Sequence, residues 1–157
     1  MAPNLLGHAW RRGNDYRMSA LVEDLQPYFA MDMSYDVIIG HSLGGAVVLS
    51  LLPFLPKTKD ITVLLLDPTI EVSAEEADMH EKIFLQEVAS AKTADECMAE
   101  NPAWSRRDCI LKAMGLSMCD GSDIKNIIRV NVQASKLQLL LTILLNSTTA
   151  RGLLVVC

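Results

Sequence analysis

One serine in this chain stands in a setting that could make it a nucleophile. Residues 40–45 read Gly-His-Ser-Leu-Gly-Gly, and a short apolar run, Val37 to Ile39, leads directly into them. A second apolar run follows and is typical of a buried helix. The order strand, G-x-S-x-G, helix predicts a serine on a sharp turn, with its hydroxyl exposed above a sheet. Ser42 is therefore the candidate nucleophile.

The small residues around Ser42 are expected to make this turn possible. At such a bend the serine backbone is strained, and the incoming strand and outgoing helix nearly touch. The positions two residues before and after the serine should therefore have no space for a side chain, and both are glycines, Gly40 and Gly44. Gly45 gives the helix room to lie against the sheet. The backbone amide of Leu43 would then face a developing oxyanion from the positive end of the helix.

The elements that must position this motif are predicted from the periodicity of the apolar residues. Residues 18–29 show helical spacing, residues 35–39 form a short strand without polar alternation, and residues 43–52 form a buried helix. Residues 61–66 form a second continuous apolar strand. Strands of this kind are typically buried on both faces, and strand, helix, strand makes a parallel βαβ unit. The predicted fold class is α/β, a parallel sheet flanked by helices.

After residue 70 the sequence predicts helices. We expect them over 74–91, 94–100 and 102–118, with a longer helix from 122 toward 146, and a further buried strand at 153–157. Each of the first three helices follows a capping signal: Ser73-x-x-Glu76, Thr93-x-x-Glu96 and Asn101-Pro102. Five apolar residues of the third helical stretch are expected to line a core face: Trp104, Ile110, Leu111, Met114 and Leu116.

Composition and charge argue against several classes of protein. The chain has 157 residues, of which 50% are hydrophobic, and this favours one globular domain. A formal net charge of −5, with scattered basic residues, argues against nucleic-acid or anionic-membrane partners. Arg106-Arg107 is expected to be a solvated helix face. No segment has the order of a signal peptide or the length of a membrane span, so we expect a cytoplasmic protein.

The cysteines do not indicate a metal or a disulfide framework. The four of them show neither C-x-x-C pairing nor a histidine at zinc-ligand spacing: Cys97, Cys109, Cys119 and Cys157. We therefore expect buried thiols in a reducing compartment, no metal and no cofactor.

At this point the chain resembles the α/β-hydrolase fold family. The GHSLGG of residues 40–45 looks like that family's nucleophile elbow, and residues 64–68, Leu-Leu-Leu-Asp-Pro, look like the next strand and its exit turn. Gly7-His8, followed by a helix that ends in Glu23-Asp24-Leu25, is similar to the loop and helix before the elbow strand.

The resemblance implies an organisation for the whole chain. Residues 1–70 would be the central part of a hydrolase core, residues 71–146 a helical lid, and residues 147–157 the remnant of a terminal strand. The family's early strands, with its second oxyanion loop, and its late histidine region find no match here. The resemblance is therefore to a partial, truncated hydrolase.

The resemblance also implies roles for individual residues. Ser42 would be the nucleophile and Leu43 a backbone oxyanion donor, and in the family the acid and then the histidine follow the serine. Asp67, at the carboxyl end of a strand, is the candidate acid, and closing an Asp-Pro turn is its alternative role. His80 is the candidate base, and a solvated helix residue is the alternative. His41 is expected to shape the site beside the serine.

These expectations lead to one main function and two alternatives. The main function is a serine hydrolase that acts on an ester or related acyl bond through an acyl-enzyme, with a small, apolar acyl substrate expected from the apolar residues of the lid. The first alternative is a non-catalytic ligand-binding or interaction protein on the same fold. The second is an inactive truncated product.

Overall fold

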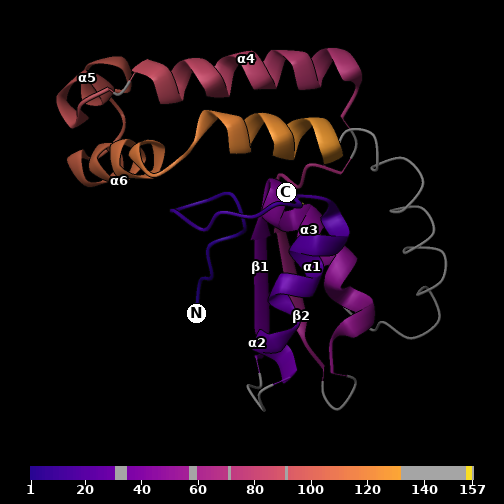
Figure 1. Cartoon of the computed structure of the whole chain (residues 1–157). Helices are drawn as coiled ribbons and strands as arrows, with labels where there is room; N and C mark the ends of the chain where they lie inside the picture. Colours follow the sequence, from indigo (N-terminus) through magenta and orange to yellow (C-terminus); the bar gives the residue numbers. More distant parts are fainter. Residues whose placement is uncertain (31–34, 57–59, 71, 91, 132–154, 157) are drawn as a thin grey trace. The chain divides into compact units, whose positions relative to one another are not determined.

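The computed structural model describes residues 1–30, 35–56, 60–70, 72–90, 92–131 and 155–156 (Figure 1). The chain divides into two compact units. The elbow unit consists of Asp15–Ser73 and Val130–Cys157, and the helical unit consists of Met1–Asn14 and Ala74–Arg129. No helix within the described ranges is both long and apolar enough to cross a bilayer.

The elbow unit contains a parallel sheet, so the expected mixture of helices with parallel strands is confirmed. Its three strands are β1 (Val37–His41), β2 (Thr62–Leu66) and β3 (Val155–Val156), in the spatial order β1-β2-β3. The register pairs Gly40 with Leu65 and His41 with Leu66, which brings the carboxyl ends of β1 and β2 to one edge. The prediction of a strand at the end of the chain is confirmed for residues 155–156, which pair with β2.

Among the described residues, helix α3 covers one face of this sheet. Helix α3 (Leu43–Leu51) leaves β1 through the turn at residue 42 and lies against that strand (Figure 1). Val48 and Leu49 of α3 form a core with Leu65 of β2, and four partly buried residues pack against this core: Ile38, Leu52, Val63 and Ile70. Helix α1 (Met18–Leu25) lies against α3 with a buried apolar face. Burial of such side chains contributes about 1.5–3 kcal/mol each.

The prediction that both faces of the first strand are buried is wrong for the described structure. The side chains of Val37 and Ile39 are 49% and 60% exposed, whereas Gly40 is buried. Successive residues of a strand point to opposite faces, and α3 covers only the face of Ile38 and Gly40. An apolar run without alternation therefore does not prove that two layers of helix enclose the strand.

Local boundaries also differ from the predicted ones. The helix expected over residues 18–29 is two helices, α1 and α2 (Pro27–Ala30), because Pro27 has no amide hydrogen with which to continue α1. The first strand begins two residues later than predicted and extends to His41. Helix α3 ends at Leu51 and passes into a short 3-10 turn, η1 (Leu52–Phe54), as expected before a proline.

The helical unit is built from α4 (Ala74–Ser90), α5 (Ala94–Glu100) and α6 (Arg106–Ser117), followed by a helical stretch over residues 121–131, whose last two residues already belong to the elbow unit. Helix α6 contacts both α4 and α5. Two largely buried carboxylates are paired with arginines within this unit. Asp123 accepts a hydrogen bond from Arg12, and Glu81 accepts one from Arg129. The rest of the helix predicted from 122 to 146 lies outside the described residues.

The capping box predicted at Thr93 is confirmed, and the helix start predicted at Pro102 is wrong. Thr93 Oγ1 accepts a hydrogen bond from the Glu96 amide at 3.3 Å, and the Glu96 carboxylate accepts one from the Thr93 amide at 2.8 Å. Helix α6 begins four residues after Pro102, where Ser105 and Asp108 form a second capping box. Asn101 instead closes the end of α5, where its side-chain amide donates to a backbone carbonyl.

The apolar face predicted for this segment is also largely exposed. The exposed fractions are 43% for Trp104, 40% for Ile110, 54% for Leu111 and 53% for Met114. The buried stripe of α6 starts instead at Cys109, which is fully buried, and continues at helical spacing through three half-buried residues: Lys112, Ala113 and Leu116. The apolar pattern does not identify this packed face, because the face contains a lysine stem and an alanine. The expectation that Arg106-Arg107 is solvated is confirmed.

Candidate active site

Ser42 occupies the sharp turn between β1 and α3. Its backbone angles are φ 51° and ψ −122°. A non-glycine residue with positive φ is uncommon, and such strain persists only where the surrounding structure imposes it. The side chain of Ser42 is half-buried. The turn therefore has the strained geometry that the G-x-S-x-G motif predicts.

Backbone hydrogen bonds hold this turn in place. The Ser42 amide donates to the Leu66 carbonyl at 3.0 Å, which ties the turn to the end of β2. The Ser42 carbonyl accepts from the amides of Gly45 at 2.9 Å and Thr69 at 3.2 Å, and its 3.4 Å contact with Ala46 begins α3. The exit of β2 and the start of α3 thus both bind the serine backbone.

The hydroxyl of Ser42 has a specific neighbour that the motif does not predict. Ser42 Oγ lies 3.1 Å from Thr69 Oγ1, a hydrogen bond in which either hydroxyl can donate. Thr69 comes two residues after Asp67, at the exit of β2. Since parallel strands end at the same edge of a sheet, the sequence did carry a signal: polar residues just after β2 should lie near those just after β1.

The structure assigns the glycines different roles from those predicted. A Cβ on Gly40 would lie 2.6 Å from the Gly44 carbonyl oxygen, so the prediction for Gly40 is confirmed. A Cβ on Gly44 would meet no atom within 4 Å, so the prediction that Gly44 must lack a side chain is wrong. The close approach is at Gly45 instead, where a Cβ would lie 2.7 Å from Pro68 Cβ. Helix α3 therefore approaches the β2 exit turn at Gly45, whereas Gly44 faces open space.

Leu43 is the first residue of α3, so its amide has no acceptor within the helix. Its side chain is half-buried. An amide at this position carries the partial positive charge of the helix start and is available to an oxyanion beside Ser42.

Asp67 and His41 stand at the same edge of the sheet as Ser42. Asp67 follows β2 directly, is exposed, and has a positive φ of 43°. The following turn is closed by a bond of 2.9 Å from the Ile70 amide to the Pro68 carbonyl. His41 is the last residue of β1 and is also exposed. In the described structure neither side chain is a hydrogen-bond partner of the Ser42 hydroxyl.

The other two histidines belong to the helical unit. His80 lies on α4, is half-buried, and places its ring edge-on to Phe84 with ring centroids 6.3 Å apart. His8 lies in the N-terminal loop, with Nδ1 3.2 Å from the Leu6 carbonyl. By sequence, His41 is the single histidine of the elbow unit.

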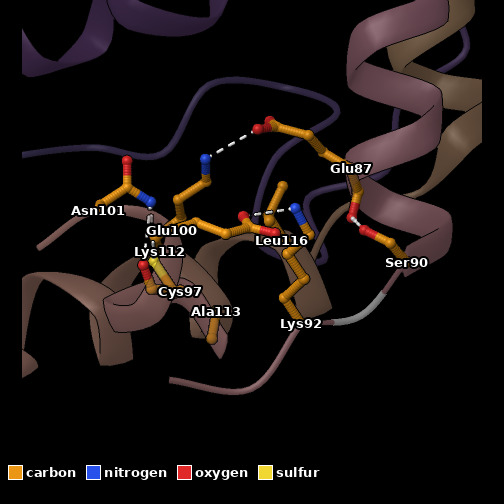
Figure 2. Close-up of a pocket in the computed structure, with 9 residues that line it drawn as sticks. All are labelled: Glu87, Ser90, Lys92, Cys97, Glu100, Asn101, Lys112, Ala113 and Leu116. Carbon is orange, nitrogen blue, oxygen red and sulfur yellow. Dashed lines mark hydrogen bonds and ion pairs between the residues drawn. The ribbon is translucent and has the colours of Figure 1, made fainter. Parts of the chain in front are cut away.

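The helical unit contains a pocket that is separate in sequence from all the predicted site residues (Figure 2). Its charged side chains are paired with each other: Lys112 with Glu87 at 2.8 Å, and Lys92 with Glu100 at 2.6 Å. Its walls come from α4, α5, α6 and the residues between them: Glu87, Ser90, Lys92, Cys97, Glu100, Asn101, Lys112, Ala113 and Leu116. With its cations neutralised, this pocket presents no free charge for an anionic ligand.

The described cysteines are all at least partly shielded from solvent. Cys97 and Cys109 are buried between α5 and α6, and Cys119 is half-buried. Burial, reinforced by contact with the Cys97 thiol, raises the pKa of the Cys109 thiol to about 11. The neutral thiol is a poor nucleophile, so Cys109 does not compete with Ser42 for a catalytic role. Cys157 lies outside the described residues, and those described contain no cluster of residues that could hold a metal ion.

Comparison with solved structures identifies a hydrolase of similar fold. The chain is similar to the crystal structure of the N-formylmaleamic acid deformylase Nfo from Pseudomonas putida S16, with a TM-score of 0.61 and 18% sequence identity. The match covers 98% of this chain and 61% of the deformylase chain, so the chain spans about three fifths of that structure. No protein-family model and no curated protein matches the sequence. At this level of identity the likeness shows a shared α/β fold.

Proposed function

We propose that this chain is a serine hydrolase of the α/β-hydrolase type, which cleaves an ester or related acyl bond through an acyl-enzyme on Ser42. The observation that carries the proposal is the positive φ of Ser42 between β1 and α3. Backbone strain of this size is concentrated at functional sites. The fold shared with a deformylase, an enzyme named for removing a formyl group, supports acyl chemistry in general.

In the proposed reaction, Ser42 Oγ attacks the carbonyl carbon of the substrate while a base accepts its proton. The Leu43 amide stabilises the oxyanion of the tetrahedral intermediate. Collapse of that intermediate breaks the bond to the leaving group, which takes the proton from the base. Water then attacks the acyl-enzyme, which releases the carboxylic acid product and regenerates Ser42. We propose Asp67 as the carboxylate of the catalytic triad and His80 as its base. These residues follow Ser42 in the chain order of the family's triad, and His41 shapes the site.

The remaining parts of the proposal concern the setting of this site. We propose residues 1–70 as the core, 71–146 as the lid and 147–157 as a terminal strand. A small, apolar acyl substrate is supported by the exposed apolar side chains of α6. The proposed enzyme works in the cytoplasm and needs no cofactor.

Labelling with a fluorophosphonate probe tests this function, because the probe modifies only an activated serine. We expect the wild-type protein to be labelled on Ser42 and Ser42→Ala to remain unlabelled. His80→Gln and Asp67→Asn should each reduce the rate of labelling if they complete the triad. Equal labelling of wild type and Ser42→Ala would refute the proposal.

One observation favours a second candidate, a non-catalytic ligand-binding protein on the same fold. The described hydrogen-bond partner of the Ser42 hydroxyl is another neutral hydroxyl, that of Thr69, and not a base. A serine held in this way keeps its proton. Reversible binding of a small apolar ligand without turnover, unchanged in Ser42→Ala, would support this candidate over a hydrolase.

A further inference from the structure

Thr69 contacts the candidate nucleophile through both its backbone and its side chain. Its amide donates to the Ser42 carbonyl at 3.2 Å, and its hydroxyl lies 3.1 Å from Ser42 Oγ. Both residues are half-buried. From this double contact we infer that Thr69 is a positioning residue of the hydrolytic site. It fixes the direction of the serine hydroxyl and stabilises the charge that develops on Oγ. This inference rests on the proposed function.

The surrounding turn explains why Thr69 can hold a fixed position. Pro68 has a restricted φ and lies against Gly45 of α3, where there is no space for a β-carbon. The Ile70 amide closes the turn by donating to the Pro68 carbonyl at 2.9 Å. The Thr69 hydroxyl is therefore held by its backbone beside Ser42 before any substrate binds.

The chemistry of two adjacent hydroxyls gives Thr69 its role. In the resting state either oxygen can donate the proton they share. Once a base has taken the Ser42 proton, Oγ can only accept, so the Thr69 hydroxyl becomes the donor. A hydrogen bond to a charged oxygen is stronger than one between neutral groups. Thr69 thus stabilises the attacking form of Ser42 more than its resting form.

Three substitutions separate the hydroxyl from the shape of the side chain. Thr69→Val removes the hydroxyl and keeps the branched shape and the backbone amide. Thr69→Ser keeps the hydroxyl. Thr62→Val is the matched control, since Thr62 is an exposed residue at the start of β2 and lies at the opposite end of that strand. Circular dichroism and thermal unfolding show whether each variant folds. If Thr69→Val does not fold, Thr69→Ala takes its place.

The measurement is the rate of fluorophosphonate labelling across a pH series. We expect Thr69→Val to react about tenfold more slowly than wild type at neutral pH, and its pH profile to move to higher pH. Thr69→Ser and Thr62→Val should stay within about twofold of wild type, with unchanged profiles. A purely structural role would lower the rate without moving the profile.

The possible failures are distinguishable. If Thr69→Val labels at the wild-type rate and with the same pH profile, Thr69 has no positioning role, while the proposed hydrolase stands. The same conclusion follows if the profile does not move, or if Thr69→Ser is as slow as Thr69→Val. If wild type is not labelled at all, the proposed function fails, and the role of Thr69 fails with it.

Discussion

Pro68 lies so close to Gly45 that a β-carbon on the glycine would be 2.7 Å from Pro68 Cβ. The contact joins two segments that the sequence separates by more than twenty residues, the start of α3 and the exit of β2. The neighbouring residue pair, Ser42 and Thr69, is joined by hydrogen bonds through both backbone and side chain. The candidate nucleophile is therefore supported by the β2 exit turn as well as by its own strand and helix.

The two glycines that follow the serine motif should respond in opposite ways to an added methyl group. Gly45→Ala is expected to lower the free energy of unfolding by about 1–3 kcal/mol, because its Cβ would overlap Pro68. Gly44→Ala should leave the free energy of unfolding unchanged or raise it by up to about 1 kcal/mol, since position 44 is helical and has open space around it. Chemical denaturation of both variants measures the difference. Equal losses at the two positions would contradict the close approach of Pro68.

Strain at Ser42 predicts that glycine is more stable there than alanine. Both Ser42→Gly and Ser42→Ala remove the hydroxyl and its bond to Thr69, so the pair differs only in backbone preference. Positive φ costs a non-glycine residue about 1–3 kcal/mol, and glycine loses about 0.5–1 kcal/mol in backbone entropy. We expect Ser42→Gly to unfold at a higher denaturant concentration than Ser42→Ala. The reverse order would show that the turn is not strained.

The start of α6 can be tested through its cap. Ser105→Ala should lower the free energy of unfolding by about 1 kcal/mol, because the Asp108 amide loses its acceptor at the helix start. Ser117→Ala, at the other end of the same helix, should change it by less than about 0.5 kcal/mol. Thermal and urea unfolding provide the comparison. If Ser105→Ala has no effect, the helix starts elsewhere.

Asp15 should make stability depend on pH in the acid range. The Arg17 side chain, which donates hydrogen bonds to the Asp15 carboxylate, lowers the pKa of Asp15 from 3.8 to about 2. A carboxyl whose pKa is depressed in the folded state contributes stability above pH 3.8, and loses it as the pH falls toward about 2. Asp15→Asn should therefore be less stable than wild type at neutral pH, and the difference should disappear near pH 2. Urea unfolding at a series of pH values measures it, and a difference that does not vary with pH would rule out the ion pair.

Burial predicts the order in which the cysteines react. With a pKa of about 11, the Cys109 thiol is ionised to roughly one part in a thousand at pH 8. Iodoacetamide should modify half-buried Cys119 before Cys109 and Cys97 in the folded protein, and all three at similar rates in urea. Peptide mass spectrometry gives the order. Early modification of Cys109 in the folded protein would contradict its burial.

The local features of this chain were determined by its sequence. The motif at residues 40–45, the apolar runs on either side and the capping box at Thr93 depend on contacts within a few residues. Short-range hydrogen bonds and steric limits act on such segments wherever they lie in a fold. They were enough to predict a strained serine turn, two parallel strands and a helix between them.

The tertiary structure decided which surfaces are covered and which distant residues meet. The periodicity of β1 and α6 identifies apolar side chains, but not the face against which a neighbour packs, and so the predicted burial of Ile39 and Leu111 is wrong. The space around Gly45 and the contact of Thr69 with Ser42 arise because β2 pairs with β1 and ends at the same edge. Such contacts depend on how whole elements pack, and the sequence indicated only that the residues after β1 and β2 share one edge of the sheet, not which of them touch.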